Sequence, residues 1–150
     1  MKRFLFFAMA IMFFALQGWS QTTLNESFEG TTFPPDDWTI ATTAGSGSWQ
    51  SSTSIARTGT KSANSAYASS GCTRWLISPR LSVTSDATNF AFWIATDDWY
   101  IDGDNIDILV STTNNETSSF STTSLLSLNQ DSVTTTWKQY SVDLQAYVGQ

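Results

Sequence analysis

The sequence predicts an all-β protein, built as a β-sandwich or jelly roll. Ser and Thr make up 44 of its 150 residues, a bias that favours strands and turns over helices. Aromatic residues reach 14%, which is too high for a disordered chain. Beyond residue 20, short stretches of alternating apolar and polar residues are separated by turn sequences, and none keeps a helical period for long.

Three stretches show this alternation most clearly, and they lie at residues 89–96, 105–111 and 137–144. In the first, Phe90, Phe92 and Ile94 share one face, and in the second Ile106, Ile108 and Val110 do so. In the third, the shared face holds Tyr140, Val142 and Leu144. Such a pattern is typical of strands with one face on a core and one in water.

Shorter apolar stretches predict the remaining strands. They lie between turn sequences such as Pro34-Pro35-Asp36 and Gly45-Ser46-Gly47. These candidate strands are Leu24–Phe28, Asp37–Ile40, Ser48–Gln50, Ala63–Ala68, Trp75–Ser78 and Ser119–Leu126. The one segment that suggests a helical turn is Gln145–Val148. Eight or nine short strands at this spacing favour a sandwich or jelly roll.

The first twenty residues have the composition of a signal peptide. Lys2 and Arg3 precede an uncharged apolar run from Phe4 to Leu16, and small residues follow at Gly18 and Ser20. The run is shorter than the roughly 20 apolar residues that a membrane-spanning helix needs. The sequence therefore predicts cleavage after Ser20, a single domain over residues 21–150, no membrane span after cleavage, and secretion or display at a bacterial cell surface.

Composition excludes several kinds of chemistry. The chain has no histidine, which rules out the Ser-His-Asp and Cys-His catalytic arrangements and the usual zinc ligands. Its single cysteine, Cys72, rules out an intrachain disulfide. The net charge is −6, and loss of Lys2 and Arg3 with the leader lowers it by two more. So acidic a chain is not expected to bind nucleic acid, whose binding depends on Lys and Arg.

Several phrases, in their order along the chain, resemble the cleaved adhesin domain family, also called choice-of-anchor domains. The phrases are Glu26–Gly30, Phe33–Pro35, Trp38–Ile40, Trp49, Gly59–Ala63, Trp75–Leu81, Phe90–Trp93, Ile108–Thr112 and Trp137–Leu144. The resemblance implies a jelly-roll β-sandwich similar to galactose-binding and MAM domains. It also implies two further strands after Leu144, so the last strands of the sandwich are expected to be missing from this chain.

The resemblance implies a non-catalytic adhesion or ligand-binding module of a secreted or cell-surface bacterial protein. Its expected partner is an extracellular protein or a polysaccharide. The alternative is an accessory domain of a secreted hydrolase, a protease or glycosidase, because related modules are appended to gingipain-type proteases. In that case the catalytic domain lies outside this chain.

Two places suggest structural calcium. Residues 97–107 hold five of the thirteen acids, among them Asp102, Asp104 and Asp107, and carboxylates are preferred calcium ligands. The spacing is not that of an EF-hand, and a solvated, Asp-rich connection between strands is the alternative. By resemblance, Glu29 is the second candidate, since related domains bind cations through an acid near this point. Its alternative role is that of a polar residue at the entry to a turn.

Two tryptophans are candidate ligand-binding residues. Trp93 lies on the strand face opposite Phe90 and Phe92, and Trp99 lies in the acidic stretch, so both are expected to be exposed. An exposed indole offers a flat surface on which a sugar ring can stack. The alternative for each is packing in the core, which is the commoner fate of tryptophan in a sandwich.

Overall fold

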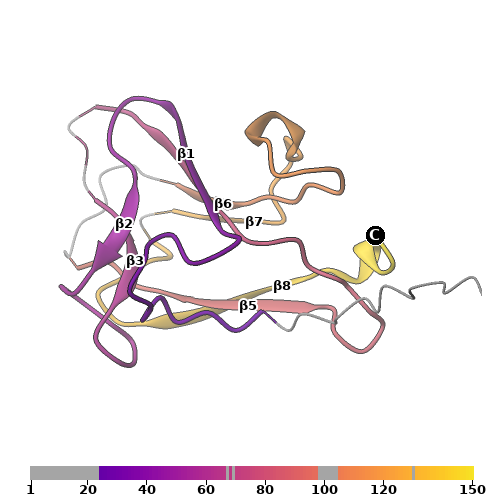
Figure 1. The fold of residues 1–150 in the computed structure, drawn as a ribbon, viewed down its shortest axis with the longest axis horizontal. Helices are drawn as coiled ribbons and strands as arrows, with labels where there is room; N and C mark the ends of the chain where they lie inside the picture. Colours follow the sequence, from indigo (N-terminus) through magenta and orange to yellow (C-terminus); the bar gives the residue numbers. More distant parts are fainter. Residues whose placement is uncertain (1–23, 67, 69, 98–104, 130) are drawn as a thin grey trace, which may run out of the picture.

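A computed structural model describes residues 24–66, 68, 70–97, 105–129 and 131–150 (Figure 1). The predicted leader lies outside this part of the chain. The described residues form eight strands and two short 3-10 turns, η1 (Thr117–Ser119) and η2 (Gln145–Tyr147). The strands are β1 (Thr39–Ala44), β2 (Trp49–Ser52), β3 (Ser62–Ser65), β4 (Thr73–Ile77), β5 (Asn89–Ile94), β6 (Ile106–Ile108), β7 (Leu126–Leu128) and β8 (Lys138–Asp143). The all-β prediction is confirmed, and the jelly-roll connectivity stays a prediction.

The strands pair in two nested sets, and every pair is antiparallel. β1 pairs with β4 and encloses the β2–β3 pair along the chain, whereas β5 pairs with β8 and encloses the β6–β7 pair. In Figure 1, the β5–β8 pair runs along the lower side of the molecule, while β2 and β3 lie at its left end. The β6–β7 pair is drawn above β5 and β8.

The β5–β8 pair follows the predicted alternation residue by residue. Exposed and half-buried residues alternate along β5, and Val142 of β8 is buried opposite Phe90. The ring of Phe92 lies 5.9 Å from that of Phe90 and 6.1 Å from that of its cross-strand partner Tyr140. Aromatic pairs at such distances stabilise a sheet beyond the area that they bury. The inner face of this pair is therefore an aromatic layer.

The β1–β4 pair contains an irregularity that gives one side chain a special role. The register shifts between Thr42 and Ala44, and the Thr43 hydroxyl accepts a hydrogen bond of 3.0 Å from the indole N–H of Trp75. The Trp75 ring also lies 5.5 Å from that of Phe120, beside η1. This register shift is a β-bulge. Through Trp75, it connects the β1–β4 pair to the loop that holds Phe120.

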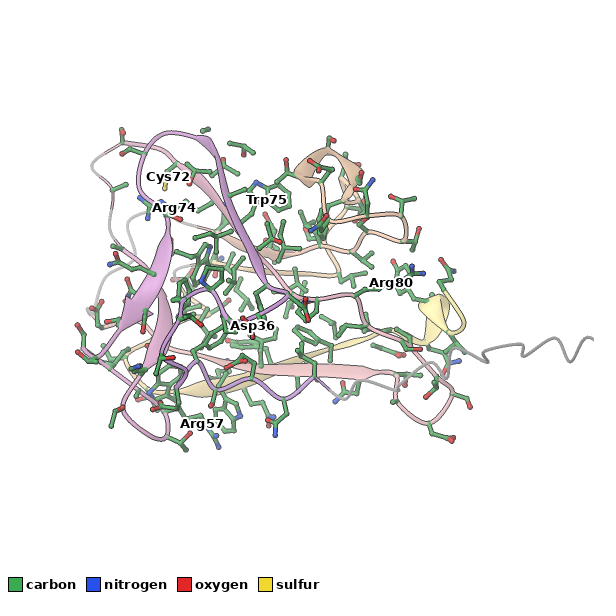
Figure 2. All side chains as sticks on the ribbon, viewed as in Figure 1. Asp36, Arg57, Cys72, Arg74, Trp75 and Arg80 are labelled. Atoms are coloured by element: carbon green, nitrogen blue, oxygen red, sulfur yellow. The ribbon has the colours of Figure 1, made fainter. Side chains whose placement is uncertain are left out.

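Arg74 of β4 holds two loops in place. Its Nε and Nη2 donate to the carbonyl oxygen of Ser46 at 2.9 and 2.7 Å, and its Nη1 donates to the Ser65 hydroxyl at 3.2 Å and to the Ala66 carbonyl. Figure 2 shows Arg74 at the end of the molecule that also holds Cys72. A planar guanidinium suits this task because its donors spread in several fixed directions.

Few side chains of the described part are buried. The buried apolar residues are Ile77, Leu128, Val133 and Val142. Every described aromatic ring keeps some exposure, and the largest exposed apolar residues are Trp93 and Val148. The described interior is therefore only partly covered.

Two predicted strands are wrong. Residues 24–28 form no strand, because Phe28 adopts a φ of 62° and its N–H donates to the Glu26 carboxylate instead of to a ladder. The Phe28 ring packs against Phe33 and Trp38, at 6.1 and 5.2 Å. Most of Ser119–Leu126 is also irregular, and the strand in this region begins only at Leu126.

The other predicted strands are present with shifted ends. β1 was expected over Asp37–Ile40 and runs over Thr39–Ala44; it begins later because Asp37 has a φ of 65° that a strand does not allow. The predicted turn at Gln145–Val148 corresponds to η2.

Candidate functional site

The outer face of the β5–β8 pair is a mainly polar surface. Its exposed residues are Asn89, Ala91 and Trp93 from β5 and Gln139, Ser141 and Asp143 from β8. Trp93 lies opposite Gln139, and the small pair Ala91 and Ser141 lies next along the strands. Because its same-face neighbours along the strands are small, the indole of Trp93 has open space on that side.

Trp93 is 40% exposed, and a cation lies against its ring. The Arg57 guanidinium carbon is 3.8 Å from the centroid of the indole, which is contact distance for a cation–π interaction. Arg57 is itself exposed, at the lower left in Figure 2. Within the described ranges, no hydrogen bond or ion pair engages its guanidinium. The expected exposure of Trp93 is present, whereas its role in binding stays a prediction.

Glu29 lies in a small cluster of hydrogen-bond donors. Its Oε1 accepts from the backbone N–H groups of Thr60 at 2.9 Å and Lys61 at 2.7 Å, and its Oε2 accepts from the Thr60 hydroxyl at 3.0 Å. The backbone hydrogen bonds from Lys61 and then Thr60 lower the pKa of the Glu29 carboxyl from its usual value. Glu29 is thus an anion held in place by Thr60 and Lys61, which directly precede β3.

The Lys61 ammonium lies at the backbone oxygens beside this carboxylate. It donates to the Gly30 carbonyl at 2.8 Å and to the Glu29 carbonyl at 3.4 Å. Gly59 completes the cluster, since it has a φ of 71° and a Cβ there would lie 2.5 Å from Oε1 of Glu29. Only glycine adopts this backbone conformation without strain and also leaves room for the carboxylate.

Glu29 and Trp93 are connected through the loop of residues 53–61, which joins β2 to β3. Arg57 lies in this loop and covers the indole, whereas Thr60 and Lys61 at its end bind Glu29. The Ser62 hydroxyl donates to the Ile55 carbonyl at 2.7 Å and closes the base of the loop. Glu29 therefore positions the loop that brings Arg57 to Trp93.

The calcium role predicted for Glu29 and Asp107 stays a prediction. Asp107 is exposed on β6 opposite Ser127, and the oxygens of Glu29 are already engaged by donors. In the described ranges, no group of three or more His, Cys, Asp or Glu side chains lies close enough to hold a metal ion. Asp102, Asp104 and Trp99 lie outside the described residues, so calcium in the acidic stretch and a ligand at Trp99 stay predictions.

Sequence reasoning did not find Arg57. It lies 36 positions before Trp93, in a Ser- and Thr-rich loop, and no local pattern connects the two residues. Its contact with the indole follows from the long-range position of the loop. The one signal in the sequence is that no acidic residue lies close to Arg57 along the chain.

One of three comparisons with known proteins, that with protein-family models, agrees with the resemblance to cleaved adhesin domains. No curated protein and no solved structure matches the chain. Across the described residues, no helix is long and apolar enough to cross a membrane. The model of the family described as Cleaved Adhesin Domain matches residues 21–149, which is most of the sequence. The chain belongs to the cleaved adhesin domain family, and it is an adhesion-related module of a kind found outside or at the surface of cells.

Proposed function

We propose that this domain is a non-catalytic adhesion module that binds an extracellular polysaccharide or protein through the outer face of the β5–β8 pair. The observation that carries the proposal is Trp93, a large aromatic residue 40% exposed on a face otherwise made of small and polar residues. An indole that is 40% exposed on a strand leaves apolar surface in water, and contact with a ligand would bury it. The absence of histidine from the sequence and membership of a family that is generally non-catalytic support binding over catalysis.

The surroundings of Trp93 favour a ligand with both apolar and hydroxyl-bearing parts. Ala91 and Ser141 lie beside the ring, and the amides of Gln139 and Asn89 offer donors and acceptors on the same face. Sugar rings combine an apolar face with a rim of hydroxyl groups. A polysaccharide chain laid along the strands would meet both kinds of surface.

A binding screen of the secreted protein tests the proposal. Immobilised polysaccharides and extracellular matrix proteins are offered, with and without added calcium, and bound protein is measured by biolayer interferometry. We expect binding to at least one of these classes and a loss of about tenfold in affinity for Trp93→Ala, because an aromatic contact contributes up to about 1.5 kcal/mol beyond the area that it buries.

Val148→Ala is the control, since Val148 is the other large exposed apolar residue of the described part and lies in the C-terminal turn. Its affinity should equal that of the unaltered protein. No binding to either class, or equal losses for the two variants, would contradict the proposal.

A further inference from the structure

We infer that Arg57 and Trp93 together form a subsite for a carboxylate-bearing sugar unit, so that the preferred ligand is a polysaccharide that contains uronic acid. The inference rests on the proposed function, because it specifies the ligand chemistry of the same face. It depends on a feature that the proposed function does not use, namely the Arg57 guanidinium that lies over the indole.

The guanidinium of Arg57 is held over the indole, and none of its N–H groups donates to a described residue. The guanidinium carbon lies over the indole, 3.8 Å from the ring centroid, and the group carries its N–H donors in a planar fork. Among the described residues no acceptor takes these hydrogens. A carboxylate matches two adjacent N–H groups of a guanidinium and accepts both in parallel.

The surroundings of its charged group distinguish Arg57 from Arg74, Lys61 and Lys138. Arg74 donates to backbone carbonyls and a hydroxyl, Lys61 donates to the carbonyls beside Glu29, and Lys138 lies 4.8 Å from the Tyr140 ring centroid. Arg57 instead offers its charge at an exposed aromatic residue, in a chain whose net charge is −6. Arg57 and Trp93 together therefore suit a ligand that carries a single negative group next to an apolar surface.

The acid on the same sheet face lies away from the subsite. Asp143 pairs with Asn89, four residues along β5 from Trp93, which corresponds to about 13 Å along a strand. Its Oδ1 also accepts from the backbone N–H of Gln145 at 2.8 Å. Repulsion between Asp143 and a carboxylate at Arg57 is therefore weakened by distance and by solvent screening.

The loop that carries Arg57 is fastened before any ligand arrives. Glu29 binds the backbone of residues 60–61, and Ser62 closes the loop at Ile55. A positioned guanidinium loses less conformational freedom on binding than a free one, which favours affinity. A uronate is preferred over an acidic peptide because the sheet face around Trp93 offers amide and hydroxyl groups that suit the hydroxyl rim of a sugar.

Titration of the secreted protein with polygalacturonate, fully methyl-esterified polygalacturonate, amylose and poly-glutamate at low salt tests the inference. We expect polygalacturonate to bind tighter than its ester, and Arg57→Gln to weaken polygalacturonate binding about tenfold while leaving binding of the ester unchanged. Arg57→Lys keeps the charge but loses the planar pair of N–H donors, so an intermediate loss of affinity for polygalacturonate is expected.

Arg80→Gln is the matched control, since it removes the same charge from an exposed residue at the opposite end of the molecule in Figure 2. Thermal melts confirm that each variant is folded. Equal losses for Arg57→Gln and Arg80→Gln, equal binding of polymer and ester, or Arg57-dependent binding of poly-glutamate as tight as that of polygalacturonate would overturn the inference. Trp93-dependent binding of neutral polymers that is indifferent to Arg57 would overturn it while leaving the proposed function intact.

Discussion

Glu29 shows how one side chain can organise a distant loop. Its carboxylate accepts three hydrogen bonds from residues 60 and 61, more than thirty positions away in the sequence. From the sequence alone, Glu29 was a candidate metal ligand or a polar residue entering a turn. Its observed partners were not predictable, because a single acid carries no information about which distant N–H groups will face it.

The stability of the protein should depend on the charge of Glu29. Because the pKa of the Glu29 carboxyl is lowered in the folded protein, its contribution to stability is complete above the ordinary glutamate value of about 4.3. The contribution is lost as the pH falls through the lower, folded-state pKa. We expect Glu29→Gln to be less stable than the unaltered protein at pH 7 and closer to it at pH 3, as measured by thermal unfolding across this range.

Glu116→Gln is the comparison for this experiment, since Glu116 is an exposed acid in a different loop. This variant should follow the unaltered protein at both pH values. The same difference between Glu29→Gln and the unaltered protein at pH 3 and pH 7 would show that ionisation of Glu29 contributes nothing to stability.

At the scale of elements, alternation of apolar and polar residues predicted strands correctly where one face of the strand is exposed to solvent. β5 and β8 extend over nearly the predicted residues and present the predicted faces, because a period of two determines the orientation of every side chain once the strands pair. Leu24–Phe28 and residues 119–125 contain apolar residues too but pair with no strand, so their composition alone wrongly predicted strands there. The acidic-stretch residues Asp102 and Asp104 lie outside the described part and remain untested.

The loop of residues 53–61 should be sensitive to its one glycine. Gly59→Ala places a Cβ 2.5 Å from Oε1 of Glu29 at a φ of 71°, so both sterics and backbone conformation oppose it. We expect a loss of roughly 1–2 kcal/mol in the free energy of unfolding, measured by urea denaturation.

Gly71→Ala is the matched substitution, because a Cβ at Gly71 meets no atom within 4 Å. It should leave stability within about 0.5 kcal/mol of the unaltered protein. If the two alanine variants are equally stable, the contact between Gly59 and Glu29 does not constrain the loop.

For the whole molecule, the partly covered interior predicts self-association. The described strands form only two-stranded sheets, which leave strand edges open, and the rings of Phe90, Phe92 and Tyr140 keep some exposure on the inner face. We expect the protein to bind the dye ANS and to show a mass that rises with concentration in light scattering. A monomer with a single cooperative melt would contradict this expectation.

Trp93→Ser serves as the control for dye binding. Trp93 lies on the outer face, so this variant removes an exposed ring while leaving the inner aromatic layer unchanged. Dye fluorescence close to that of the unaltered protein would locate the bound ANS at the inner face. A large loss would place it at the outer face instead.

The nesting of the strand pairs has a consequence for the order of folding. All partners of β1 to β4 lie before residue 78, and all partners of β5 to β8 lie after residue 88. A chain that emerges with its N-terminus first can therefore complete the ladders of its first half before the second half is available. Arg57 belongs to the early half and Trp93 to the late half, so the proposed binding surface comes into existence only when the two halves meet.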